Sequence, residues 1–492
     1  MALAGVLAPS RVQAQASQYI PLDDPRLPLL EHLIARGIVE DPSPMIRPFR
    51  RTDALRVLAA ADSTAGSSDR TLLREAREHF AERAGNRWSL ELRAGGQGYS
   101  QSRRELLHRA GPSGARPYAE LRAAATFGNI ILATRPVVEP RLKDDPDWPG
   151  RRDVDVPAWM ADAYVSAQFK YGSVFYGQMN RNWGPAGLPG IPLSDYGYER
   201  QGLALEVGTS TLRLSALATE LQDQLDSLGR TVHRYYFVHR LHAGLSRRFS
   251  LALWEGVVLA GADRNFETRY RNPLSISYLA NTIGLGDRGN VLLGADVRWQ
   301  AFGRTTINAQ LALDDFWYQN RQRNRDRWAF TLGAEGPLME NVAWHALYTQ
   351  VSSLALRAFN SAENFTDAGV GIGRNFTDQD RLSLQITFPV RDRWLLSPEL
   401  TLLRQGEGRI NDPYPVPDAN GVLATPSLFI GIVERTYRTA LGLSGASGPL
   451  EITANAGFHH VVNSGHQPGR TVNRFEGRIQ ATLGLSREGG LR

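Results

Sequence analysis

Cysteine is absent from this chain of 492 residues, and lysine occurs only as Lys143 and Lys170. Without cysteine the protein has no disulfide framework, no thiolate metal site and no N-terminal cysteine to carry a lipid anchor. If the protein is held at a membrane, its fold must therefore hold it there. The scarcity of lysine also means that the formal net charge of +6 comes from arginine.

This positive charge has two interpretations. Arginine-rich surfaces bind polyanions such as acidic polysaccharide, lipopolysaccharide phosphate or nucleic acid. Alternatively, a GC-rich genome encodes arginine in place of lysine, and the spread of basic residues along the whole chain favours this interpretation. The sequence has no basic helix, zinc-ligand spacing or aromatic–basic recognition signature, so we expect no nucleic-acid partner.

Long hydrophobic runs are also missing. No stretch approaches the roughly 18 consecutive apolar residues of a transmembrane helix, and the mean hydropathy of −0.32 is that of a soluble protein. Neither criterion detects a transmembrane β-barrel, because only alternate residues of each of its strands face lipid. The 47 glycines are compatible with a protein of strands and turns.

One stretch, 291–317, sets the pattern for most of the chain. Apolar residues alternate with polar or very small residues over 291–299 and again over 305–313, with a tight link at 302–304. Alternation with period two gives a strand one apolar and one polar face. Each arm has roughly 10 residues, which is enough for a tilted strand to cross a bilayer core. Aromatic residues mark both ends, as membrane-interface girdles do: Trp299, Phe302, Phe316 and Trp317.

The same alternation recurs between residues 87 and 485, for example at 119–127, 161–169, 212–218, 235–245, 328–334, 382–388, 452–458 and 475–485. Roughly 400 residues at about 22 per strand and connection give about 18 strands, and a closed bacterial barrel needs an even number. We therefore predict a mainly β fold over 87–492, a large antiparallel transmembrane β-barrel.

The lengths of the connections support this prediction. Short links at 128–129, 171–173, 208–210, 246–248 and 302–304 alternate with long polar ones at 139–157, 181–201, 220–234, 261–290 and 315–327. Outer-membrane barrels sort their connections in this way, with short periplasmic turns and long extracellular loops. Beyond residue 375 the alternation breaks in this assignment, and the strand tally becomes odd.

The N-terminal residues follow a different pattern. Residues 1–16 resemble the remnant of a signal peptide, with an apolar run at 2–8 and a small-x-small cleavage site at Ala14-Gln15-Ala16; a frayed helix is the alternative. Over 17–86, apolar residues recur at helical spacing in three short segments, which predicts a small helical bundle placed at one mouth of the barrel.

The sequence contains few features that indicate a catalytic site. There is no nucleophile elbow and no phosphate-binding glycine loop. His239 and His242 are three apart on one strand and therefore face opposite sides, which disfavours a metal site. We expect no catalytic residues, no metal and no cofactor.

The most distinctive segment is 175–185, which begins as a strand and ends in Trp183-Gly184-Pro185. Its planar hydrogen-bonding and aromatic side chains are of the types that bind sugars. We predict Tyr176, Arg181, Asn182 and Trp183 as glycan-binding residues. The alternative is that Tyr176 and Trp183 belong to the aromatic girdles and that Arg181 pairs with an acid inside the lumen.

The Gly177-Gln178 strand running into Trp183-Gly184-Pro185, with the Pro21-Leu22 and Leu33-Ile34-x-x-Gly37 segment, resembles the capsule-assembly Wzi family. Glutamine at 178 departs from that family, which often has arginine there. The resemblance implies an eighteen-stranded outer-membrane barrel with its helical bundle on the periplasmic side.

By the same resemblance the protein is non-enzymatic and attaches capsular or extracellular polysaccharide to the cell surface in a lectin-like way. We expect a monomer in contact with outer-membrane lipid and lipopolysaccharide. A porin-like channel for sugars or ions and an outer-membrane lipolytic enzyme remain the alternatives.

Overall fold

A computed structural model describes residues 15–62, 66–100, 113–264, 272, 274–276, 289–315, 325–391 and 393–491. Eighteen antiparallel strands form one sheet, which closes where β1 pairs with β20 in the register Arg87↔Gly490 to Tyr99↔Arg478. The predicted eighteen-stranded barrel is therefore confirmed. The residues described include no helix long and apolar enough to cross a membrane.

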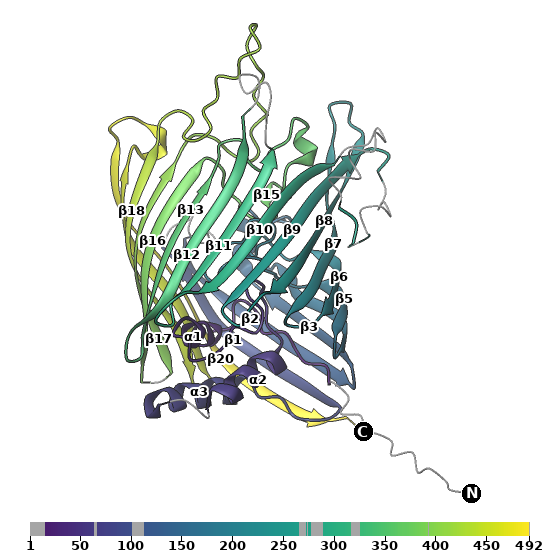
Figure 1. Ribbon diagram of the computed structural model, residues 1–492, viewed down its shortest axis with the longest axis vertical. Helices are drawn as coiled ribbons and strands as arrows, with labels where there is room; N and C mark the ends of the chain where they lie inside the picture. Colours follow the sequence, from purple (N-terminus) through teal and green to yellow (C-terminus); the bar gives the residue numbers. More distant parts are fainter. Residues whose placement is uncertain are drawn as a thin grey trace, which may run out of the picture.

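Each strand of the barrel pairs with its neighbours in the sequence (Figure 1). The strands are β1 (Arg87–Tyr99), β2 (Gly114–Phe127), β3 (Ile130–Val138), β4 (Ala158–Phe169), β5 (Gly172–Gln178), β6 (Gln201–Gly208), β7 (Leu212–Leu225), β8 (Thr231–Gly244), β9 (Phe249–Gly261), β10 (Asn290–Gln300), β11 (Thr306–Asp315), β12 (Arg327–Met339), β13 (Val342–Val351), β16 (Gln379–Val390), β17 (Trp394–Gln405), β18 (Glu434–Ser447), β19 (Leu450–Val462) and β20 (Thr471–Gly490). A separate two-stranded ribbon, β14 (Thr366–Asp367) with β15 (Val370–Gly371), lies in the connection between β13 and β16.

In the hairpin of β10 and β11, the alternation of apolar and polar residues gives the wall one apolar and one polar face. Its strands pair with Val297 opposite Ala309, and its apolar side chains, such as Leu293 and Leu311, are 36% and 45% exposed. The polar side chains between them face the lumen and are buried or half-buried, with Asp296 at 2%. An exposed apolar face and a buried polar face are what a barrel wall in a bilayer requires.

The connections sort by length around the whole barrel, which corrects the sequence-based assignment beyond residue 375. After β13 comes the long connection 352–378, then the turn 391–393, the long connection 406–433 and the turn 448–449. Long and short links thus continue to alternate. The assignment went wrong because much of 352–378 folds as irregular chain and the short ribbon β14–β15, which add no strand to the barrel.

Three helices occupy the end of the barrel where the turns are short: α1 (Leu27–Ala35), α2 (Arg51–Asp62) and α3 (Ser67–Phe80) (Figure 1). Their apolar residues form one buried cluster, including Leu30, Leu58 and Leu73. Helix α1 also contacts β12, β13, β16 and β18. The helices therefore close one mouth of the barrel, and they lie where the periodicity predicts them.

The first turn of α2 is held by a residue from outside the helix. The helix begins at Arg51, and the hydroxyl of Ser17 accepts a hydrogen bond from the Thr52 N–H at 3.0 Å. Ser17 Oγ in turn donates to Glu82 at 2.7 Å. A residue 35 positions upstream thus satisfies a free N–H of the first helical turn.

Candidate functional site

The segment after β5 leaves the wall and turns into the lumen. Tyr176 is still on the strand and faces outward, 57% exposed, on the same side as Val174. At Gly177 the backbone has a φ of +139°, and a Cβ there would collide with the carbonyl oxygen of Ala163. Glycine permits both the unusual dihedral and the close approach of the neighbouring strand β4.

Asn182 and Trp183 lie inside the lumen and are 6% and 4% exposed. The backbone of Asn182 forms a two-way bridge with Arg47, with N–H···O distances of 2.8 and 3.0 Å. Its side-chain amide donates to Leu188 O and accepts from Gly190 N. Asn182 therefore connects the N-terminal segment to the connection 179–200.

Two hydrogen bonds hold the backbone of Trp183. Its N–H donates to Leu193 O at 2.9 Å, and its carbonyl accepts from Gln310 Nε2 at 3.0 Å. The indole is part of the largest buried apolar cluster, which also contains Tyr236 and Trp254 of the wall. The inserted chain thus shares one buried apolar cluster with strands of the wall, and Gln310 of β11 is hydrogen-bonded to Trp183.

Arg181 lies beside these two residues with its guanidinium carbon 4.3 Å from the ring centre of Phe175. Its Nη2 atom is buried and has no hydrogen-bond partner among the residues that the structure describes. The structure thus brings Arg181, Asn182 and Trp183 together inside the barrel and places Tyr176 on the other face of the wall.

A second inserted connection, 352–378, fills the lumen from the same end. The buried guanidinium of Arg234 donates to three of its carbonyl groups, those of Ala362, Asn364 and Thr366, at 2.6 to 2.9 Å. The two insertions meet where Ser194 donates from its backbone and hydroxyl to the carbonyls of residues 372 and 373. We call the connections 179–200 and 352–378 together the upper plug.

The upper plug is also tied to the connection 406–433 through Asp378. Its carboxylate accepts from the backbone N–H groups of Gly408, Phe429 and Ile430 at 2.5 to 3.0 Å. Burial raises the pKa of Asp378 above its ordinary value, although these three donors act in the opposite direction. The connections 179–200, 352–378 and 406–433 therefore form one hydrogen-bonded body.

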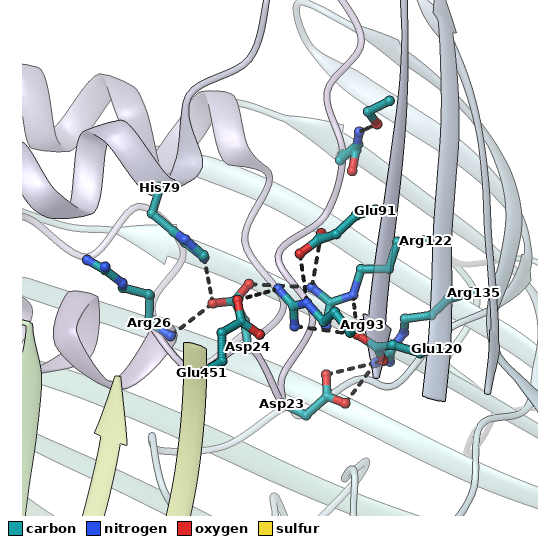
Figure 2. Close-up of polar contacts among 12 residues, drawn as sticks. Asp23, Asp24, Arg26, His79, Glu91, Arg93, Glu120, Arg122, Arg135 and Glu451 are labelled. Atoms are coloured by element: carbon teal, nitrogen blue, oxygen red, sulfur yellow. Dashed lines mark hydrogen bonds and ion pairs between the residues drawn. The ribbon is translucent and has the colours of Figure 1, made fainter. Parts of the chain in front are cut away.

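At the opposite end, the chain before α1 lies against charged residues of the wall, which Figure 2 shows. Arg93 and Glu91 on β1 stand directly opposite Glu120 and Arg122 on β2. Arg122 Nε is 2.9 Å from Glu120, and Arg93 Nη1 is 3.4 Å from it. Opposite charges on facing residues of neighbouring strands stabilise the pairing. We call these residues, with Asp23, Asp24, Arg135 and Glu451, the luminal ion cluster.

The N-terminal segment contributes two carboxylates to this cluster. Asp23 lies 2.7 Å from Arg135, and Asp24 accepts from His79 at 2.9 Å and lies 3.7 Å from Arg122. Burial alone would raise the pKa of Asp24, but His79 and the arginines lower it well below its ordinary value. For Asp23, Arg135 and Arg122 outweigh burial and lower the pKa to about 2. Both side chains are therefore ionised at neutral pH.

Three aromatic residues, Trp148, Trp159 and Tyr198, lie together at the end of the barrel that holds the long connections. We call them the outer aromatic cluster. The ring of Tyr198 lies 4.8 Å from that of Trp148 and 5.3 Å from that of Trp159, each edge-on. The Tyr198 hydroxyl donates to Asp145 at 2.7 Å, and Arg141 binds the same carboxylate at 2.6 Å. Trp148 is partly exposed. Ring faces beside fixed polar groups are the arrangement that binds sugars.

Within the described part of the chain, no three His, Asp or Glu side chains are grouped so that they could hold a metal ion. His242 is buried in the lumen, whereas its neighbour His239 lies 3.4 Å from Glu255 on the adjacent strand β9.

No family model and no curated protein matches this sequence. Among solved structures, the chain is similar to Wzi of Escherichia coli, an outer-membrane protein involved in group 1 capsule assembly and a carbohydrate-binding β-barrel. The two share 13% identity over 95% of this chain and 99% of that one, with a TM-score of 0.66.

Two further structures are similar to a lesser degree. They are the outer-membrane protein OprD of Pseudomonas aeruginosa (12% identity, 83% of this chain, 96% of that one, TM-score 0.46) and OccAB4 of Acinetobacter baumannii (10%, 83%, 99%, 0.45). The likeness to Wzi shows a shared β-barrel fold.

Neither the luminal ion cluster nor the outer aromatic cluster is among the sites predicted from the sequence. The sequence does contain a local pattern for the luminal ion cluster, because Glu91-x-Arg93 and Glu120-x-Arg122 place opposite charges two residues apart on one face of a strand. The second joins residues that are 50 positions apart in the sequence, Trp148 and Tyr198, and no local pattern connects them.

Proposed function

We propose that this protein is a non-enzymatic anchor that attaches capsular or extracellular polysaccharide to the outer membrane. The observation that carries the proposal is the filled lumen. Chain enters the barrel from both ends, and Arg47 of the N-terminal segment hydrogen-bonds to Asn182 of the upper plug inside it. A barrel filled in this way is a poor conduit but a rigid support for surface loops. The likeness of the fold to a carbohydrate-binding barrel adds support.

In the proposed orientation, the helices and short turns face the periplasm and the long connections face the cell exterior, as in other outer-membrane barrels. The protein acts as a monomer. The partly exposed indole of Trp148, edge-on to Tyr198 and Trp159, supplies the contact surface for a sugar ring. The earlier candidates Arg181, Asn182, Trp183 and Tyr176 stay predictions, and Asn182 and Trp183 here donate to backbone carbonyls of their own connection.

Deletion of the gene tests the proposal in cells. An anchor holds finished polymer, so its loss should release polysaccharide into the medium while the total amount synthesised stays constant. Cells that keep their polymer at the surface would contradict the role. A porin-like channel, by contrast, should produce stepwise conductance when the purified protein is inserted into planar bilayers, whereas the filled barrel should be nearly silent.

A glycan-binding measurement with purified protein tests the site. Trp148→Ala should abolish retention on the polysaccharide of the same strain. Trp299→Ala is the matched control, because Trp299 is a 46% exposed tryptophan on the lipid-facing side of β10. Equal binding by both variants would exclude the outer aromatic cluster as the contact.

A further inference from the structure

A cavity of about 460 Å³ lies at the end of the barrel that holds the helices, between α3 and two turns of the wall. Its lining includes Arg74 and Glu75 of α3, Arg391 and Arg393 of the turn after β16, Trp394 of β17, and Ser447 of β18. This volume is within the range of sites for small organic ligands, roughly 300–1,000 Å³. The site is shared between the helical unit and the barrel.

The cavity is strongly basic. Arg391 makes no hydrogen bond or ion pair with a residue that the structure describes. Arg393 is half-exposed; it donates to Ser447 Oγ at 3.3 Å and lies 3.7 Å from Glu75. The ion pair of Arg74 spans 4.0 Å to an exposed glutamate, a geometry that contributes little in water. The cavity's own acid, Glu75, is already bound at 3.1 Å by Arg26.

The cavity also sits at the edge of the lipid-facing surface. Trp394 is the first residue of β17 and lies on the same face of that strand as Leu400, which is 57% exposed. Tryptophan at the end of an apolar strand face marks the membrane–water interface. The arginines of the 391–393 turn lie just beyond it, at the depth of lipid headgroups.

We propose that this cavity binds the phosphate group of an anionic phospholipid in the adjacent leaflet. Guanidinium groups bind phosphate through charge-assisted hydrogen bonds, and the Trp394 indole packs against the glycerol and upper acyl chain. The identity of the leaflet rests on the orientation proposed above, but the site itself does not depend on the glycan role. Because Arg74 and Arg391 come from different units, the bound lipid connects the helical unit to the wall.

Native mass spectrometry of the full chain in detergent micelles tests this site, with dioleoylphosphatidylglycerol and dioleoylphosphatidylcholine as probes. The wild type should retain one phosphatidylglycerol in preference to phosphatidylcholine. Basic residues near a membrane surface contribute about fivefold in affinity each. The double variant Arg391→Ala/Arg393→Ala should therefore bind phosphatidylglycerol about 30-fold more weakly.

The matched control is Arg247→Ala/Arg248→Ala, which removes the same charge from an exposed turn between β8 and β9 at the same end. Its affinity should equal that of the wild type. An equal loss in both double variants, or no preference for phosphatidylglycerol over phosphatidylcholine, would overturn the proposal. Displacement of the lipid by an equimolar amount of inorganic phosphate would also overturn it, because the cavity would then be a site for free phosphate.

Heat-modifiable migration on gels reports whether each variant forms a barrel. If the alanine variant does not fold, Arg391→Lys/Arg393→Lys replaces it, because lysine keeps the charge and loses the planar fork of donors. This variant should keep its preference for phosphatidylglycerol over phosphatidylcholine. Loss of that preference with the charge retained would contradict a site that depends on charge.

Discussion

Asp24 is the residue through which the contact between the N-terminal segment and the barrel wall is best tested. It is 2% exposed, and one carboxylate oxygen accepts from the Arg26 N–H and from His79, each at 2.9 Å. The other oxygen lies 3.7 Å from Arg122. Asp24→Asn has nearly the same shape and can still accept the backbone hydrogen bond, so the substitution removes mainly the negative charge.

The size of the effect follows from this geometry. At an effective dielectric constant of 20, unit charges at the Asp24–Arg122 separation attract by about 4–5 kcal/mol. Removing one partner of a buried pair typically costs about 3–5 kcal/mol, because the other charge stays buried without compensation. We therefore expect Asp24→Asn to destabilise the docked helical unit by about 3 kcal/mol. This corresponds to roughly a hundredfold larger population of the undocked state.

Limited trypsin digestion of the folded barrel measures that population. When opening and closing are fast relative to cleavage, the cleavage rate tracks the fraction of open molecules. Cleavage within α3, at Arg70 or Arg74, should therefore be about a hundredfold faster in Asp24→Asn. Asp53→Asn is the matched control, since Asp53 is 43% exposed and lies 3.7 Å from Arg56 on the helix surface. Equal rates for both variants would refute the role assigned to the luminal ion cluster.

Three further predictions concern packing, backbone and pH. Trp183→Ala should lower the free energy of unfolding in urea by about 3–5 kcal/mol, whereas Tyr176→Ala on the lipid face should change it by less than about 1 kcal/mol. Gly177→Ala should cost at least about 1–3 kcal/mol through its left-handed backbone, with Gly333→Ala on β12, where a Cβ would meet its nearest atom at 3.7 Å, as the control. Burial lowers the pKa of His32 from 6.5 to about 3, so stability is complete above pH 6.5 and is lost as pH falls toward 3. At pH 5 the free energy of unfolding should be about 2 kcal/mol lower than at pH 6.5 and above. Urea unfolding of His32→Asn should not show this loss at low pH.

The wall of the barrel was predictable because its residues obey a local rule. Alternation over 291–313 gave the two strands of the β10–β11 hairpin, and the lipid-facing exposure of Leu311 beside the buried Gln310 confirms the assignment of faces. The aromatic residues Phe316 and Trp317, expected at one end of this hairpin, lie outside the described residues. So do residues 1–14, which hold most of the expected signal-peptide remnant.

The interior was not predictable in the same way. Trp183 and Asn182 have the residue types of a sugar site, and nothing in the local sequence reveals that the segment folds inward. The contacts that bury it come from far away, from Gln310, 127 residues downstream, and from Arg47 before α2. The odd strand tally beyond residue 375 has a related cause, since the connection 352–378 contains the ribbon β14–β15, which pairs only with itself.

The two fillings of the lumen are held by different interactions. The three bonds from Arg234 to backbone carbonyls of the upper plug do not depend on the ionisation of any acid. The acid Asp378 ties the plug to the connection 406–433, far from the N-terminal segment. The N-terminal segment is fixed by carboxylates, Asp23 and Asp24, against arginines of the wall. Loss of the acid charges should therefore release the helical unit while the loops at the other end keep their shape. The backbone bridge between Arg47 and Asn182, which joins the two fillings, does not depend on those charges either. A surface that presents sugar-binding groups thus keeps its support when the acids at the opposite mouth lose their charge, as an anchor requires and a gated channel does not.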